Sequence, residues 1–244
     1  MVTLQRGDPV ATALVEAIRS GDLQTLGRLL GERPGLAAAR IADDKGGSRT
    51  PLHIVTDWPG HFLNAAAVVG VLLQAGADPN APVEGSWHAE TPLHWAASSD
   101  DVQALDALLD GGADIEAQGA SIGGGSPLDD AVGYGQWRAA RRLVERGART
   151  RLWHAAALGL MDRVEAAFAS SPPPTRQEVT EAFWQACHGG QRQAAEYLLG
   201  RGADLNWAAA WDGRTPLDIA RNQDAEELAG WLGSRGARSA GEPG

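Results

Sequence analysis

The chain has 244 residues and a formal net charge of −10, and its composition excludes several classes of protein. No apolar run reaches the roughly 18 residues that a membrane-spanning helix needs. The single lysine, Lys45, and arginines that alternate with acids argue against nucleic-acid binding, which needs clustered cations. The single cysteine, Cys187, excludes an internal disulfide and a cysteine-rich metal site. The first residues lack the apolar core of a secretory signal, so we expect a cytoplasmic protein.

Two short cassettes recur along the chain. The first places Thr or Ser before Pro-Leu, which caps a helix N-terminus and puts proline at the first helical position, where its missing N–H costs nothing. The second ends a Leu-rich helix with Gly-Ala, and its glycine supplies the left-handed residue of a helix C-cap. Each pair of cassettes predicts two helices joined by a turn and followed by an extended finger. The first cassette stands at 50–55, 91–97, 126–131 and 215–220, and the second at 72–78, 108–114, 143–148 and 198–204.

The residues Thr-Pro-Leu-His at 50–53 and 91–94 resemble the signature of the ankyrin repeat, which has a period of about 33 residues. The resemblance implies an all-α solenoid of about seven helix-turn-helix repeats with β-turn fingers, the outer two repeats acting as caps. We expect a single domain over 8–238 and a disordered tail at 239–244. The preference for Arg over Lys and for Ala and Gly suggests a bacterial source. The expected repeats span about 8–41, 50–80, 91–118, 126–148, 150–172, 175–206 and 215–238.

The fingers depart from a regular pattern. The interval between the two full signatures exceeds one period, and we place the extra residues in the turn 57–64 and the finger 82–90. The next finger, 118–125, is also long and rich in glycine, but almost no room for a finger remains before Thr150. These interruptions predict a bent or two-part groove whose most elaborated part covers 43–137.

The resemblance also implies where a partner would bind. Partners of ankyrin repeats usually contact the finger tips and the positions that follow the Ala-Ala of the first helix. In addition, a set of titratable side chains from three consecutive repeats could face one pocket, namely Asp57, His61, His88, Glu90, Asp130 and Tyr134. The full set of candidate binding residues is Asp57, Trp58, His61, Trp87, His88, Glu90, Ser98, Ser99, Asp130, Tyr134, His188, Trp211, Asp212 and Arg214.

The nine tryptophans allow structural as well as functional interpretations. Trp58, Trp87 and Trp211 either line a binding surface or form small cores for the long fingers, and the sequence leaves both interpretations open. Other tryptophans lie within first-helix cassettes and are expected to pack between repeats. These packing tryptophans are Trp95, Trp153 and Trp184.

The histidines do not predict a metal site. His53 and His94 occupy the signature position, and the resemblance implies that they order the turn by hydrogen bonding. His53 and Asp57 are four residues apart, but zinc needs three or four convergent ligands, and the Pro-Gly at 59–60 turns His61 away from that helix. We therefore expect neither a metal nor another cofactor.

Two classes of function fit these observations. No nucleophile elbow, phosphate-binding glycine loop with lysine or dinucleotide fingerprint occurs in the sequence. The favoured interpretation is therefore a soluble, monomeric binding scaffold that holds a protein partner in its concave groove and against its long fingers, not an enzyme. The alternative is a small-molecule-binding protein or enzyme whose His, Trp and carboxylate pocket is formed by the repeats spanning 43–137. A passive spacer in a larger assembly fits the same sequence as the favoured interpretation.

Overall fold

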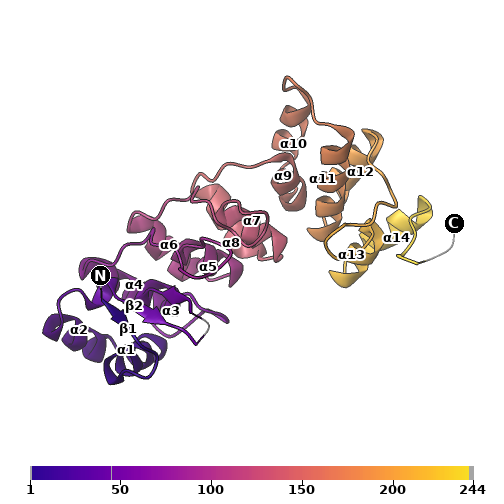
Figure 1. The fold of residues 1–244 in the computed structure, drawn as a ribbon. Coiled ribbons are helices and arrows are strands. Elements are labelled where there is room, and N and C mark those ends of the chain that lie inside the picture. The colour runs from indigo at the N-terminus through magenta and orange to yellow at the C-terminus, as the bar shows by residue number, and fades with distance from the viewer. Residues whose placement is uncertain (1, 45, 242–244) are drawn as a thin grey trace. The chain divides into compact units, whose positions relative to one another are not determined.

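In the computed structural model, which describes residues 2–44 and 46–241, the chain is mostly helical. Within these residues, fourteen α-helices form seven consecutive pairs whose two members contact each other (Figure 1). None of the described helices is long and apolar enough to cross a lipid bilayer. The all-α repeat architecture predicted from the sequence is thereby confirmed. By its contacts the chain divides into an N-terminal unit, Met1–Ala148, and a C-terminal unit, Arg149–Gly244, and each is described by itself.

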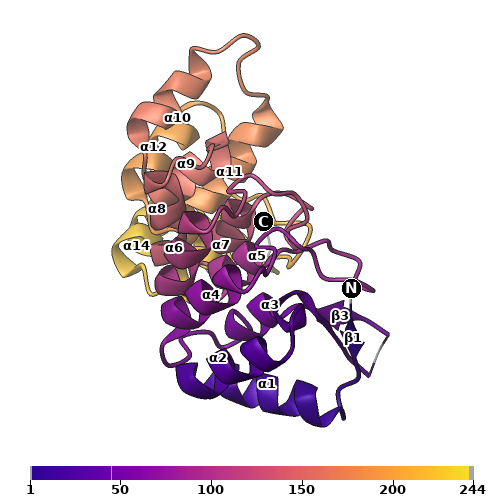
Figure 2. The same ribbon diagram turned by 90° about the vertical axis from the view of Figure 1, so that its left-hand side faces the viewer.

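The N-terminal unit stacks four helix pairs in two layers. The first helix of each pair contacts the first helix of the next pair, and the second helices do the same (Figure 2). Small side chains allow this close approach: Ala96 and Ala97 on the first helix of the third pair are fully buried. The pairs are α1 (Pro9–Ser20) with α2 (Leu23–Glu32), α3 (Pro51–Val55) with α4 (Ala65–Gln74), α5 (Pro92–Ser98) with α6 (Val102–Asp110), and α7 (Pro127–Gly133) with α8 (Trp137–Glu145).

The signature histidines connect one repeat to the next. His53 Nδ1 accepts the backbone N–H of Thr50 at 3.3 Å, so Nε2 carries the ring proton and donates it to the Glu90 carbonyl at 3.1 Å. His94 repeats both bonds one repeat later, at 3.0 and 3.3 Å. Burial lowers the pKa of His53 to about 3, which keeps the imidazole neutral. The expected structural role of these histidines is confirmed.

A small sheet anchors the long finger 82–90. Ser48 pairs with Glu84 through two backbone hydrogen bonds of 2.9 Å. The buried Arg40 guanidinium donates to the Pro82 carbonyl at 2.6 Å and forms an ion pair with Glu84 at 3.4 Å. The finger is thus held at its base, while Trp87 at its tip is fully exposed. The sheet contains β1 (Thr3–Leu4), β2 (Arg40–Ala42) and β3 (Ser48–Arg49), and the 3₁₀ helix η1 (Leu36–Ala38) precedes β2.

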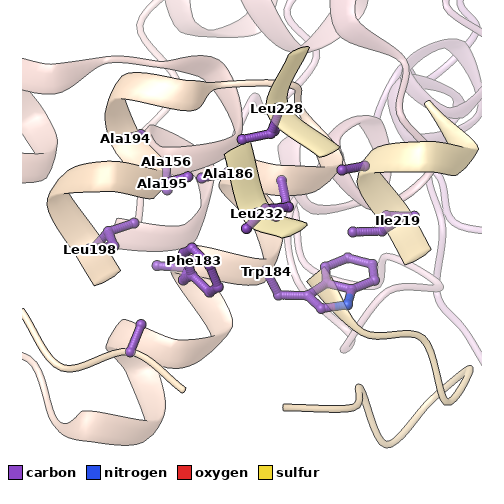
Figure 3. Packing of buried hydrophobic residues seen from close by; sticks show 14 of the residues in the cluster. Ala156, Phe183, Trp184, Ala186, Ala194, Ala195, Leu198, Ile219, Leu228 and Leu232 are labelled. Atoms are coloured by element: carbon purple, nitrogen blue, oxygen red, sulfur yellow. The ribbon is translucent and has the colours of Figure 1, made fainter. Parts of the chain in front are cut away.

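The C-terminal unit contains three helix pairs around one apolar core. Phe183 and Leu198 are fully buried at its centre, and alanines such as Ala186 and Ala195 bring the helices close together (Figure 3). Cys187 lies in the same core, and burial raises the pKa of its thiol. The thiol is therefore protonated and enclosed, as expected for a small core residue. The pairs are α9 (Leu152–Leu158) with α10 (Met161–Phe168), α11 (Arg176–His188) with α12 (Arg192–Gly200), and α13 (Pro216–Asn222) with α14 (Glu226–Ser234).

Hydrogen bonds set the start of α11 and hold the last described residues of this unit. Helix α11 begins early because Thr175 and Glu178 form a capping box, in which the Thr175 amide donates to the Glu178 carboxylate at 2.7 Å. Of the expected tail, residues 242–244 lie outside the described residues. Before them, the Ala240 amide donates to the Asp218 carboxylate on α13 at 2.9 Å.

Candidate functional site

The N-terminal unit carries an open pocket of about 490 Å³ across three consecutive repeats. Its walls come from the turn after α3, the residue before α5, the C-terminal end of α5, the finger before α7, and the turn between α7 and α8. These positions line up because every first helix ends on the same side of the stack. The pocket is lined by Thr56, Asp57, Trp58, Glu90, Trp95, Ser98, Ser99, Ser121, Tyr134 and Gln136.

Three aromatic side chains give the pocket its apolar surface. Trp58 is 74 % exposed and Tyr134 is 52 % exposed, although both are large aromatic groups. Trp95 is partly buried: its ring meets the edge of His53 at a centroid distance of 4.9 Å and lies 6.0 Å from the Arg49 guanidinium carbon. Two of the three rings are therefore held mainly by their own turns and remain open to a ligand.

Hydrogen bonds between repeats fix the floor. The Gln136 amide donates to the Ser98 carbonyl at 3.0 Å, and the Ser99 hydroxyl donates to the Thr56 carbonyl at 3.4 Å. Each bond joins a residue of one repeat to the backbone of its neighbour. The lining positions are thus held in a defined register before any ligand binds.

Glu90 supplies a partly buried carboxylate. Burial raises its pKa, while a hydrogen bond from Trp95 and the nearby His88 act in the opposite direction. Among the described residues, no arginine forms an ion pair with Glu90. Within the described residues, the carboxylate therefore has a hydrogen bond from Trp95 and no arginine partner.

Asp130 lies directly behind the pocket wall and is fully buried. Its Oδ1 accepts hydrogen bonds from the Ser121 hydroxyl at 2.9 Å and the Ile122 amide at 3.0 Å, whereas no described atom hydrogen-bonds Oδ2. Burial raises the pKa of Asp130 to about 7, against the effect of these two bonds, and the charge of Glu90 adds to the increase. Ser121 also contacts the Tyr134 hydroxyl at 2.8 Å, so a hydrogen-bonded chain links the exposed phenol to the buried carboxyl.

The opposite end of the pocket is electrically different. Asp57 Oδ2 accepts hydrogen bonds from Arg19 at 3.0 Å and from Arg49 at 2.9 Å. Two cations therefore meet one carboxylate there, and Asp57 has its charge compensated. The pocket consequently has one end with unpaired acids and one end where arginines already hold the acid.

Several candidate residues of the N-terminal unit lie elsewhere. His61 is displaced from α3, as expected, and its amide donates to the Asp101 carboxylate at 2.8 Å beside a separate hollow that includes Arg138. Trp87 and His88 are exposed at the finger tip and do not line the pocket. The proposed six-residue titratable cluster is thus gathered only in part: Asp57, Glu90 and Tyr134 line the pocket, and Asp130 lies behind it.

Four lining residues were not among the candidates. Ser121 lies on a finger whose path was not predictable, and Gln136 follows a turn that carries no signature. Thr56 directly precedes a candidate, and Trp95 was assigned to packing. Trp95 does pack against His53 of the preceding repeat, and it also lines the pocket. The signal that could have found it is its position one turn before Ser98 and Ser99 on the same helix.

The candidates of the C-terminal unit surround an aromatic cluster. The Trp211 ring meets Trp184 at 5.2 Å and Trp207 at 5.5 Å, in both cases edge to face. The Trp184 indole N–H donates to the Arg214 carbonyl of the next repeat at 3.0 Å. The ring N–H groups of His53 and His94 make the equivalent bond to the next repeat in the N-terminal unit. Burial lowers the pKa of His188, beside this cluster, to about 4. The expected inter-repeat packing of Trp184 is observed.

Within the described residues, no group of three or more His, Cys, Asp or Glu side chains is arranged to hold a metal ion. Comparison with known families matches residues 64–152 to the family described as ankyrin repeats (3 copies). A search of curated protein sequences gives no match. The matched segment contains most of the pocket and begins within the second helix pair. Residues 64–152 of this chain therefore carry the ankyrin-repeat pattern.

Proposed function

We propose that the protein binds a segment of another protein across the pocket of its N-terminal unit. Ankyrin repeats generally act as protein-interaction scaffolds, which supports this class of function. The observation that carries the proposal is the open pocket with exposed aromatic walls built from three consecutive repeats. Aromatic side chains that enter or line such pockets supply a large share of interface energy.

The shape of the pocket favours a protein segment over an enclosed small molecule. Trp58 is 74 % exposed, so a small ligand beside it would leave much of the indole in water. A chain that crosses several repeats would cover Trp58 and Tyr134 at once and would bury their apolar area. The hydrogen-bonded floor supports the same conclusion, because a preorganised surface lowers the entropy cost of binding.

The test is selection of peptides from a random display library on the intact protein. Selected peptides should bind the wild type and should lose at least about tenfold in affinity for the Trp58→Ala/Tyr134→Ala variant. Trp87→Ala is the matched control, because it removes an even more exposed aromatic ring of the same unit outside the pocket. Circular dichroism of each variant would establish that the fold is retained.

Two outcomes would contradict the proposal. Peptides that bind the double variant as tightly as the wild type would place the interaction elsewhere. Failure to select any peptide, together with a metabolite that co-purifies with the wild type and not with the double variant, would favour a small-molecule pocket instead.

A further inference from the structure

We infer that the pocket receives a protonated basic side chain, a lysine or arginine of the partner segment, between Glu90 and the rings of Trp58, Trp95 and Tyr134. The inference rests on the proposed function and adds the chemistry of the residue that is recognised. Three features favour a cation: the carboxylate of Glu90, the aromatic rings around it, and the pairing of Arg19 and Arg49 with Asp57.

The first argument is the carboxylate of Glu90, which forms no ion pair with a described arginine. A carboxylate that is partly withdrawn from water loses hydration, and an opposite charge nearby restores favourable interactions. Among the described residues no arginine supplies that charge to Glu90, whose side chain lines the pocket. A cation from the partner would therefore be attracted to this end of the pocket.

The second argument is the aromatic surface around that carboxylate. The face of an indole or phenol ring carries negative potential, and Lys and Arg bind there within about 6 Å of the ring centre. Trp58 and Tyr134 expose their rings to solvent, and Trp95 both lines the pocket and donates its N–H to Glu90. The long methylene stem of a basic side chain would cover the rings while its charged end reaches the carboxylate.

The third argument comes from the buried acid behind the wall. Asp130 is fully buried, and no described atom hydrogen-bonds its Oδ2. It joins the pocket surface through Ser121, whose hydroxyl bonds both Asp130 and Tyr134. When it ionises, this second carboxyl group on the same side as Glu90 adds to the preference for a positive ligand.

The arginines near the pocket do not reverse this preference. Arg19 and Arg49 both bind Asp57 Oδ2 and lie toward the turn after α3. Neither side chain lines the pocket, and Arg49, whose guanidinium carbon lies 6.0 Å from the Trp95 ring, is held by Asp57, so the rings of Trp58 and Tyr134 stay open to a ligand cation. The cation is therefore expected at the Glu90 end.

The closing experiment titrates the intact protein with three small probes while the indole N–H signals of Trp58 and Trp95 are followed by NMR. The probes are the Nα-acetyl methylamides of lysine, of norleucine, which has a similar stem without charge, and of glutamate. We expect saturable shifts with the lysine probe and at least about tenfold weaker binding of norleucine and glutamate. Glu90→Gln should weaken lysine binding about tenfold, whereas Glu16→Gln, which removes an exposed acid of the same unit, should leave it unchanged.

Several results would overturn the inference. Equal binding of norleucine and lysine, stronger binding of glutamate, no saturable shift with lysine, or an unchanged lysine affinity in Glu90→Gln would each exclude recognition of a cation. Failure here is distinguishable from failure of the proposed function. Selected peptides that require Trp58 and Tyr134 but contain no Lys or Arg would preserve protein binding and reject the basic side chain. Binding of the lysine probe without any selected peptide would support recognition of a basic group and reject binding of a protein segment.

Discussion

The two units use aromatic residues near the ends of their first helices in opposite ways. In the C-terminal unit, Trp184 makes the inter-repeat bond of a signature histidine, and Trp211 and Trp207 pack against one another beside it. In the N-terminal unit that bond is made by the small imidazole of His53. Trp58 lies in the turn that follows α3, the helix of His53; it is 74 % exposed and lines the pocket.

The difference lies in the signature position itself, where Trp184 is only 3 % exposed, because Trp211 beside it is still 58 % exposed. An indole that satisfies the inter-repeat bond also brings a large apolar surface, which neighbouring rings cover. An imidazole makes the same bond within less volume; Trp95 packs against it, and Trp58 in the following turn stays exposed. Aromatic content alone therefore does not identify a binding surface, because the same residue type serves as core in one unit and as pocket wall in the other.

The largest expected effect tests whether Trp184 belongs to the core. Trp184→Ala should lower the free energy of unfolding of the C-terminal unit by about 3–5 kcal/mol, because it leaves a cavity in the core and removes the indole hydrogen bond to the Arg214 carbonyl. Urea unfolding measures this change. Trp58→Ala is the control and should change stability by less than about 0.5 kcal/mol, since its ring is mostly in water. Equal losses in the two variants would remove the distinction between the units.

The second prediction concerns the buried acid of the N-terminal unit. Because burial raises the pKa of Asp130 to about 7 in the folded state, its protonated form stabilises the fold at low pH. That contribution is lost as pH rises from the ordinary value near 4 through the folded value. Between about pH 5 and pH 8, wild type should therefore lose about 2–3 kcal/mol more stability than Asp130→Asn, which cannot ionise.

Urea unfolding over this pH range measures the difference between wild type and Asp130→Asn. Glu16→Gln serves as the control, because this exposed acid should leave the pH profile of wild type unchanged. Parallel profiles for wild type and Asp130→Asn would show that Asp130 ionises as an ordinary carboxyl and that burial does not raise its pKa.

The smallest expected change in stability concerns the Ser121 hydroxyl, which lies between Tyr134 in the pocket and the buried Asp130. Ser121→Ala removes a bond to Asp130 and a bond to Tyr134, and should cost about 1 kcal/mol of unfolding free energy. It should also raise the pKa of Asp130 further, because the lost hydrogen bond stabilises the ionised carboxylate. Carboxyl ¹³C NMR follows that titration. Ser98→Ala, whose hydroxyl bonds only a carbonyl of its own helix, should leave the pKa unchanged.

Much of the fold could be predicted because its signals are local. Thr-Pro at helix starts, Gly-Ala after helix ends and the capping box at Thr175 act within a few residues, so the sequence displays them directly. The sheet was not predicted. Its strands pair Thr3 with Arg40 and Ile41 with Arg49, and an isolated bridge joins Ser48 to Glu84; such contacts between distant segments leave no periodic pattern in short strands.

The candidate site was predictable only where it follows the repeat. Ser98, Ser99 and Tyr134 line the pocket because equivalent positions of stacked repeats face the same side. Ser121 depends on the path of a glycine-rich finger, in which Gly119 has a φ of 129° that only glycine adopts readily. His61 and His88 lie on extra residues as well, and their final positions away from the pocket follow from the routes of those insertions.

The sequence by itself determined the helix pairs, their order and the residues that stack between them, because helix caps and apolar spacing act over short distances. Only the tertiary structure decided which polar groups lose their water. Among the residues that the structure describes, Asp130 Oδ2 is buried without a hydrogen-bond partner, Glu90 has no arginine partner, and Arg19 and Arg49 both pair with Asp57. The charge of a site depends on burial and on distances between side chains far apart in the chain, and those quantities exist only in the folded protein.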